Sequence, residues 1–170
     1  MAVCLPTFAS SGLQIVVWKS LFSLGVYRDG VPVEREGASA CVEVALGAAP
    51  VGDKVRQGDE HTPEGEFRVT HRNPNSSFTL SLGLNYPTRR HGERAFSLGQ
   101  IDRATRDLVV ASDKPGTMPA RSTSLGGDIY IHGGGATPTD WTDGCIGLED
   151  VDIRWLYALA DAGTKVLILP

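Results

Sequence analysis

The chain has 170 residues, 41% of them hydrophobic, and carries a formal net charge of −4. This length suits a single domain that buries a sizeable core. The acidic balance argues against a nucleic acid as partner, because proteins that bind nucleic acids present a basic face. No apolar run reaches the roughly 18 residues that a membrane span requires, so we expect a monomer without a membrane span.

The first 12 residues form a tail with two possible interpretations. Phe8-Ala9-Ser10 resembles a signal-peptide cleavage site, but the stretch lacks a basic beginning and Pro6 interrupts its short apolar run. The segment is therefore either a plain N-terminal tail or the remnant of a longer export signal. We expect the folded domain to cover residues 13–170.

Beyond the tail, the apolar residues recur mostly with the period of two that is typical of β-strands. The stretches with this pattern are residues 13–18, 21–27, 40–46, 65–71, 77–84 and 165–169. Clusters of Gly, Pro, Asp and Asn separate them. The sequence therefore predicts a mainly β fold, either a sheet-on-sheet sandwich or a barrel-like core.

One helix is predicted near the C-terminus, over residues 151–162. Acidic residues suit its positively polarised beginning, and Gly163 suits the position after its end. Its apolar residues recur at helical spacing and should face the sheet; they are Ile153, Leu156, Tyr157 and Ala160.

The middle of the chain is harder to interpret. Five arginines within residues 89–106 are interspersed with acidic residues, which indicates a solvated surface of mixed charge rather than an anion site. Residues 112–127 contain several prolines and glycines without an apolar period. They predict a solvent loop, or a lid if a cleft lies nearby.

The chain has three cysteines, Cys4, Cys41 and Cys145. An odd number leaves at least one thiol free in a monomer. We interpret Cys41, which lies in an apolar stretch, as core filler. Cys4 could pair with it only if the tail folds back, and the sequence leaves this open.

A histidine and a cysteine flank one short loop. His132 follows an apolar run, and Cys145 follows Gly144, which permits a tight turn. An imidazole can accept the proton of a thiol whose ordinary pKa is about 8.5, and the N–H groups of such a turn can bind an oxyanion. Structural roles for both residues remain the alternative. Metal-ligand spacing is absent from the sequence, so we expect no metal or cofactor.

These residues also form a family motif. His132-Gly133, a loop, and then residues 142–146, which read Thr-Asp-Gly-Cys-Ile, resemble the signature of the L,D-transpeptidase catalytic domain: His-Gly, a loop, and Ser/Thr-x-Gly-Cys-Ile/Val. Residues 44–54 and 62–67 resemble the N-terminal sheet of that family and its Thr-Pro-x-Gly turn. The resemblance covers residues 13–169, with residues 85–127 poorly matched.

The resemblance implies an enzyme of the periplasm or cell envelope that acts on peptidoglycan stem peptides. Cys145 would be the nucleophile and His132 its base. The backbone N–H groups of Gly144 and Cys145, with that of Asp143 as a further candidate, would hold the oxyanion. A backbone carbonyl, rather than a carboxylate, would orient the imidazole. The residues expected to contact the substrate are Gly133, Trp141, Thr142 and Asp143.

Two positions depart from the family pattern. Many members carry His directly before the Gly-Cys pair and Arg two residues after the cysteine, where this chain has Asp143 and Gly147. The acyl acceptor therefore stays open between an amine of a second stem and water, as in a carboxypeptidase, an amidase or an antibacterial toxin. A non-catalytic wall-binding module is the alternative of a different class.

Overall fold

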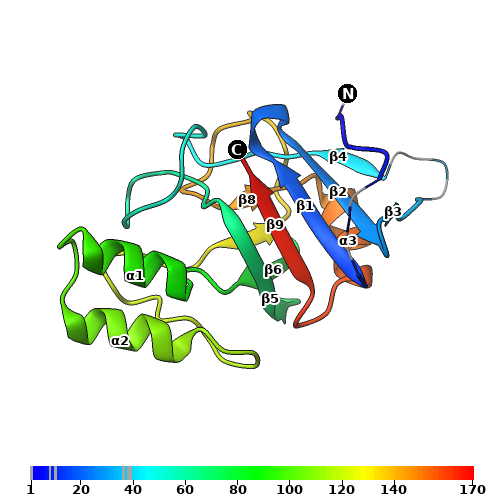
Figure 1. Cartoon of the computed structure of the whole chain (residues 1–170). Coiled ribbons are helices and arrows are strands. Elements are labelled where there is room, and N and C mark those ends of the chain that lie inside the picture. Colours follow the sequence, from blue (N-terminus) through cyan, green and yellow to red (C-terminus); the bar gives the residue numbers. More distant parts are fainter. Residues whose placement is uncertain (1, 8, 10, 36, 38–39) are drawn as a thin grey trace.

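The structure is a computed structural model that describes residues 2–7, 9, 11–35, 37 and 40–170. Parts of the proposed cleavage site, Phe8 and Ser10, lie outside the described residues, as does Met1. Figure 1 shows one strongly curled sheet, with α1 and α2 side by side near one end and α3 on its other side. No helix in the described ranges is both long and apolar enough to cross a membrane.

Most of the ordered secondary structure is strand. The strands are β1 Leu13–Trp18, β2 Ser23–Arg28, β3 Val31–Pro32, β4 Cys41–Glu43, β5 Gly65–Asn73, β6 Ser81–Leu84, β7 Tyr130–His132, β8 Ile146–Gly147 and β9 Lys165–Leu169. Their order in the sheet is β3-β2-β1-β9-β5-β6-β7-β8, and β4 pairs with β2. The helices are α1 Arg89–Ser97, α2 Arg103–Ser112 and α3 Asp150–Leu159, with a short 3-10 turn, η1, at Lys19–Leu21.

The predicted mainly β fold is confirmed, and the curled sheet is the barrel-like form of that prediction. β1 and β9 have the predicted bounds and pair in parallel. β2 begins two residues later than predicted because Lys19 and its neighbours form η1. The buried Lys19 ammonium donates to the carbonyl oxygens of Gly52 and Thr62 and to the Glu64 carboxylate. A buried ammonium requires such partners, so this turn fixes the loop before β5.

The prediction of a single helix was incomplete, because α1 and α2 form in the arginine-rich segment. Thr88 and His91 form a capping box at the start of α1, and the Asp102 side chain accepts the Thr105 N–H at the start of α2. Only a small separate core, which includes Ala95 and Val109, lies between the two helices. Much of their remaining surface carries charged side chains, and Leu108 is exposed among them, so the sequence does not show a simple apolar face for these helices.

The predicted C-terminal helix is confirmed as α3, although it is shorter at its end. Ile153, Leu156 and Ala160 are completely buried in the main core. Ala160 already has an extended backbone. Gly163, at φ 93°, lies in the following turn and donates its N–H to the Val69 carbonyl. The chain therefore leaves the helix early to enter β9.

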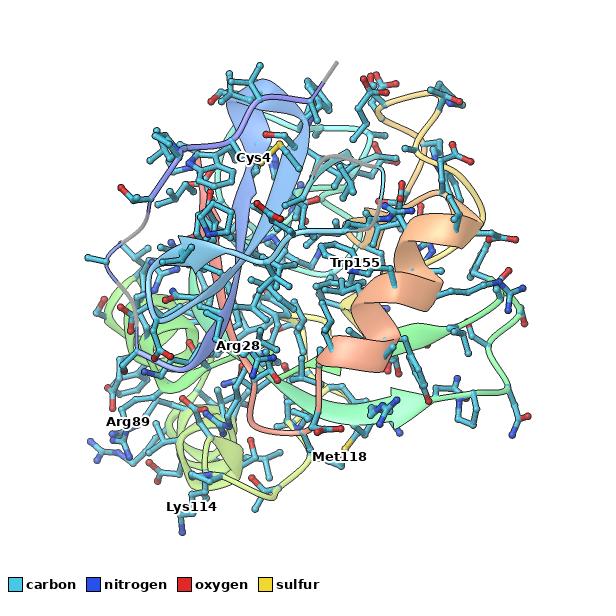
Figure 2. All side chains as sticks on the ribbon, turned by 90° about the vertical axis from the view of Figure 1, so that its right-hand side faces the viewer. Cys4, Arg28, Arg89, Lys114, Met118 and Trp155 are labelled. Carbon is cyan, nitrogen blue, oxygen red and sulfur yellow. A yellow bond between two sulfur atoms is a disulfide. The ribbon has the colours of Figure 1, made fainter. Side chains whose placement is uncertain are left out.

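The interpretation of Cys41 as core filler was wrong, since Cys4 and Cys41 form a disulfide. The bond is visible beside the label of Cys4 in Figure 2. The tail folds back over β2: the Ser23 hydroxyl donates to the Val3 carbonyl at 2.7 Å, and the Tyr27 hydroxyl donates to the Leu5 carbonyl at 2.6 Å. Cys145 is the free cysteine.

We expect the Cys4→Ser/Cys41→Ser variant to lose about 3–4 kcal/mol of unfolding free energy, because the disulfide closes a long loop in the unfolded chain. Equilibrium unfolding in guanidinium chloride measures this loss. Cys145→Ser, which keeps the disulfide, is the control and should unfold close to the unmodified protein. Equal stability of the double variant and the control would contradict the prediction.

Candidate active site

Parallel pairing of β7 with β8 brings the predicted histidine and cysteine together. Ile131 pairs with Ile146 and His132 with Gly147, so Cys145 lies opposite Tyr130, directly before β8. Side chains alternate between the faces of a sheet. His132 and Cys145 therefore project from the same face, and both line one cleft.

The imidazole of His132 is held in one orientation. Its ring is buried, stacks on Phe78 with 4.5 Å between centroids, and meets Trp141 edge-on at 5.7 Å. Its Nδ1 lies 2.6 Å from the carbonyl oxygen of Gly133. Because a carbonyl only accepts hydrogen bonds, Nδ1 carries the proton and Nε2 has a free lone pair. Burial lowers the pKa of His132, which keeps the ring neutral and able to act as a base.

Cys145 is a neutral thiol in this environment. Removal of water around the half-buried residue raises the pKa of its thiol to about 11. The sulfur accepts the Tyr130 N–H at 3.4 Å and donates to the Asp128 carbonyl at 3.5 Å. The resting site therefore does not contain a preformed thiolate. Deprotonation has to accompany attack on a substrate.

The loop before Cys145 is organised by Thr142. Its buried hydroxyl donates to the Cys145 carbonyl at 2.7 Å and accepts the Gly144 N–H at 3.2 Å. Gly144 has φ 124°, and a Cβ there would lie 2.6 Å from the His61 carbonyl oxygen, so only glycine fits. Of the N–H groups expected to bind the oxyanion, that of Gly144 is thus already engaged. The N–H groups of Asp143 and Cys145 have no acceptor among the described residues and are the better candidates.

The other expected substrate contacts separate into two groups. Trp141, Thr142 and Asp143 line the cleft, whereas Gly133 does not. A Cβ on Gly133 would lie 2.6 Å from the Asp150 carboxylate and 2.7 Å from the Phe78 carbonyl oxygen. Gly133 therefore allows close backbone packing next to His132 and does not line this cleft.

The Cys145 sulfur borders two clefts. The larger has a volume of about 550 Å³ and is lined by Lys54, Gln57, Gly58, Glu60, Phe78, Arg121, Gly126, Gly127, Asp128, Ile129, His132, Trp141, Thr142, Asp143 and Cys145. The smaller, of about 380 Å³, is lined by Asn73, Asn75, Ser76, Ser77, Phe78, Ser81, Asp128, Tyr130, His132 and Cys145. The larger cleft carries charged groups of both signs, whereas uncharged polar groups prevail in the smaller one.

Several lining residues were not predicted from sequence. Phe78 follows a stretch rich in Asn and Ser. A large aromatic residue directly after such a polar stretch could have indicated a binding site. Lys54 belongs to a loop held by Asp59, whose carboxylate accepts the Lys54 ammonium at 2.7 Å and the N–H groups of residues 55, 56 and 61. These bonds outweigh burial and lower the pKa of Asp59. The described residues contain no cluster of three or more potential metal ligands.

A family model for YkuD, the L,D-transpeptidase catalytic domain, matches residues 13–168. The chain belongs to this family. Comparison with curated protein sequences finds no match. Solved structures with the same fold include the helical cell shape determining protein Pgp2 from Campylobacter jejuni, with a TM-score of 0.59, 20% identity, and coverage of 95% of this chain and 49% of Pgp2.

Two further structures resemble this YkuD domain. The L,D-transpeptidase from Xylanimonas cellulosilytica has a TM-score of 0.55 at 20% identity, over 97% of this chain and 64% of that one. Bd1075 from Bdellovibrio bacteriovorus has a TM-score of 0.58 at 19% identity, over 97% of this chain and 51% of that one. The chain thus spans about half to two thirds of these relatives. At such identities the comparison shows a shared fold.

The structure explains one departure of this YkuD domain from the family motif. At Gly147 a Cβ would lie 2.9 Å from the Gly135 carbonyl oxygen and 3.2 Å from the Ala45 side chain. An arginine cannot be accommodated there without moving backbone. Asp143 is exposed at the cleft, so a carboxylate stands where many members have a histidine.

We expect His132→Gln to lower the acylation rate of Cys145 at neutral pH by about 10²- to 10⁴-fold, because a general base is lost. The rate of the variant should then rise towards pH 11, where the thiol ionises without help. In the unmodified protein the acylation rate should fall at acid pH with an apparent pKa below the ordinary value of histidine, because the pKa of His132 is lowered. This apparent pKa describes His132 and Cys145 together, since their titrations are coupled. The measurement is the acylation rate by a carbapenem against pH. An unchanged rate at neutral pH would show that another group activates Cys145.

Proposed function

We propose that this YkuD domain is a peptidoglycan L,D-transpeptidase. Cys145 attacks the carbonyl of the L-centre of a diaminopimelyl residue in a tetrapeptide stem and expels the terminal D-alanine. The thioacyl group then passes to an amine of a second stem. Family membership over residues 13–168 and the shared cleft of His132 and Cys145 support this reaction.

The chemistry follows from the two neutral side chains. As the sulfur–carbon bond forms, the thiol proton moves to Nε2 of His132, and the Gly133 carbonyl stabilises the resulting imidazolium through Nδ1–H. The N–H groups of Asp143 and Cys145 bind the oxyanion, and in other enzymes one such donor contributes about 2.7–4 kcal/mol. The carbon–nitrogen bond then breaks, and the imidazolium protonates the leaving amine.

The observation that carries transfer, rather than hydrolysis, is the position of Cys145 between two clefts. A stem peptide bound covalently in one cleft leaves the other open to an acceptor. The smaller cleft, rich in Asn and Ser, offers hydrogen-bonding groups to a second peptide. Hydrolysis by water needs no such second site.

The cell envelope is the compartment that fits this proposal. Peptidoglycan lies outside the cytosol, and a disulfide such as Cys4–Cys41 persists in oxidising compartments. The similar structure of Pgp2 is that of a protein described as determining helical cell shape, which agrees with a role in the wall. The intact His132 and Cys145 argue against a merely wall-binding module.

Incubation with purified disaccharide tetrapeptide should yield free D-alanine and a cross-linked dimer, both detected by mass spectrometry. Cys145→Ala should give neither product, because no other atom can form the thioester. Arg89→Gln, on the exposed start of α1, should behave like the unmodified protein. Release of D-alanine without dimer would instead show a carboxypeptidase, and the absence of any product would contradict the proposed activity.

A carbapenem should form a stable adduct on Cys145, because its strained carbonyl resembles the acyl donor. Intact-mass analysis should show one added carbapenem in the unmodified protein and none in Cys145→Ala. A folded protein with a free thiol and no adduct would count against an open, reactive site.

A further inference from the structure

The larger cleft contains two cationic side chains, and only one of them is available to a ligand. Lys54 and its partner Asp59 are 3% and 5% exposed, and their charged atoms lie 2.7 Å apart. This cation is neutralised inside the protein. Arg121 is 47% exposed and pairs with Asp128, which is 59% exposed, at 2.9 Å. An exposed pair of this kind contributes little to stability, so a ligand can replace Asp128 at low cost.

Arg121 lines the same cleft as Cys145 and is linked to it through Asp128. The residue that binds its guanidinium through its carboxylate, Asp128, accepts the Cys145 thiol through its backbone carbonyl at 3.5 Å. The backbone of Arg121 is also fixed, since a Cβ on Gly127 would lie 2.2 Å from the Arg121 Cβ. The Gln57 N–H donates to the Ser124 carbonyl at 2.9 Å and ties this segment to the opposite loop.

The geometry suits an exchange of partners. A guanidinium has five N–H donors in a planar fork, and the Asp128 carboxylate uses Nη1. If Arg121 turns to a ligand, Asp128 keeps the Tyr130 hydroxyl as a donor at 3.4 Å. Glu60 and Asp143 also line the cleft and repel an anion. Arg121 is therefore the side chain of this cleft that can balance the charge of a bound carboxylate.

We propose that Arg121 is a specificity residue that binds a carboxylate of the donor stem peptide beside the scissile carbonyl and exchanges Asp128 for it. This inference rests on the proposed function. A stem that ends in diaminopimelyl-D-alanine offers two such groups, the α-carboxylate of the terminal D-alanine and the free carboxylate of the diaminopimelyl residue. Both present the same chemistry to the guanidinium.

The test measures binding in the Cys145→Ala background, so that no turnover interferes. Isothermal titration is carried out with three tetrapeptides: the free acid, the form amidated at the terminal D-alanine, and the form amidated on the diaminopimelyl residue. We expect one of the two amides to bind about tenfold more weakly than the acid, which identifies the carboxylate. Adding Arg121→Gln should lower the affinity for the free acid by a similar factor. The free acid and that amide should then bind equally tightly.

Arg121→Lys should retain part of the preference, because it keeps the charge but not the fork. Higher salt should reduce the preference. Arg89→Gln removes an arginine that does not line the cleft and that lies at the outer edge of the molecule in Figure 2, so it should leave all three affinities unchanged. If Arg121 had only a structural role, Arg121→Gln would lower the affinities for the free acid and for both amides by the same factor.

The inference is overturned if Arg121→Gln binds the free acid as tightly as the protein with Arg121. It is also overturned if the ratio of the affinities for acid and amide is the same with and without Arg121, or if none of the peptides binds. D-alanine release by the protein with Cys145 intact is measured in parallel. Its absence contradicts the proposed function, whereas release together with an unchanged acid-to-amide ratio contradicts only the role of Arg121.

Discussion

The short parallel ladder between β7 and β8 is the constraint on which the site depends. β7 has three residues and β8 two, and a shift of register by one residue would move Cys145 to the opposite face of the sheet. Contacts outside the ladder prevent this shift. Gly147 forms a bridge with Ala45, Thr142 forms one with Gly47, and the His132 carbonyl accepts the Leu148 N–H at 2.8 Å. The chain around residue 46 therefore clamps the nucleophile loop from the side opposite β7.

This clamp works because backbone approaches backbone without intervening side chains. A Cβ on Gly47 would lie 2.0 Å from the Glu60 carbonyl oxygen and 3.0 Å from the Gly144 Cα. The loop that carries Lys54 and Asp59 thus presses, through Gly47, against the turn that positions Cys145. The turn that places Cys145 is thus packed tightly on this side. Burial of Cys145 in its turn raises the pKa of the thiol.

Sequence reasoning identified those parts of the molecule that are encoded locally. β1, β9 and α3 have clear apolar periods, and the pair of His132 and Cys145 stands in a contiguous motif. The features that it missed depend on long-range contacts. Cys41 comes close to the tail only because β4 pairs with β2, with Cys41 opposite Gly25. Arg121 reaches the cleft only because the segment after α2 folds back against residue 57, and no local pattern encodes that path.

The neutral state of His132 and Cys145 is compatible with the proposed enzyme of an oxidising compartment. A thiolate is the form that oxidises and exchanges with disulfides, and a disulfide, Cys4–Cys41, lies in the same chain. A thiol with a raised pKa is protected while no substrate is bound. In the proposed mechanism its reactivity comes from interactions that form during attack, when the proton moves to His132 and the oxyanion meets the N–H groups of Asp143 and Cys145. Stabilisation confined to the transition state raises the rate without activating the resting thiol, so the burial that makes Cys145 unreactive at rest is compatible with catalysis.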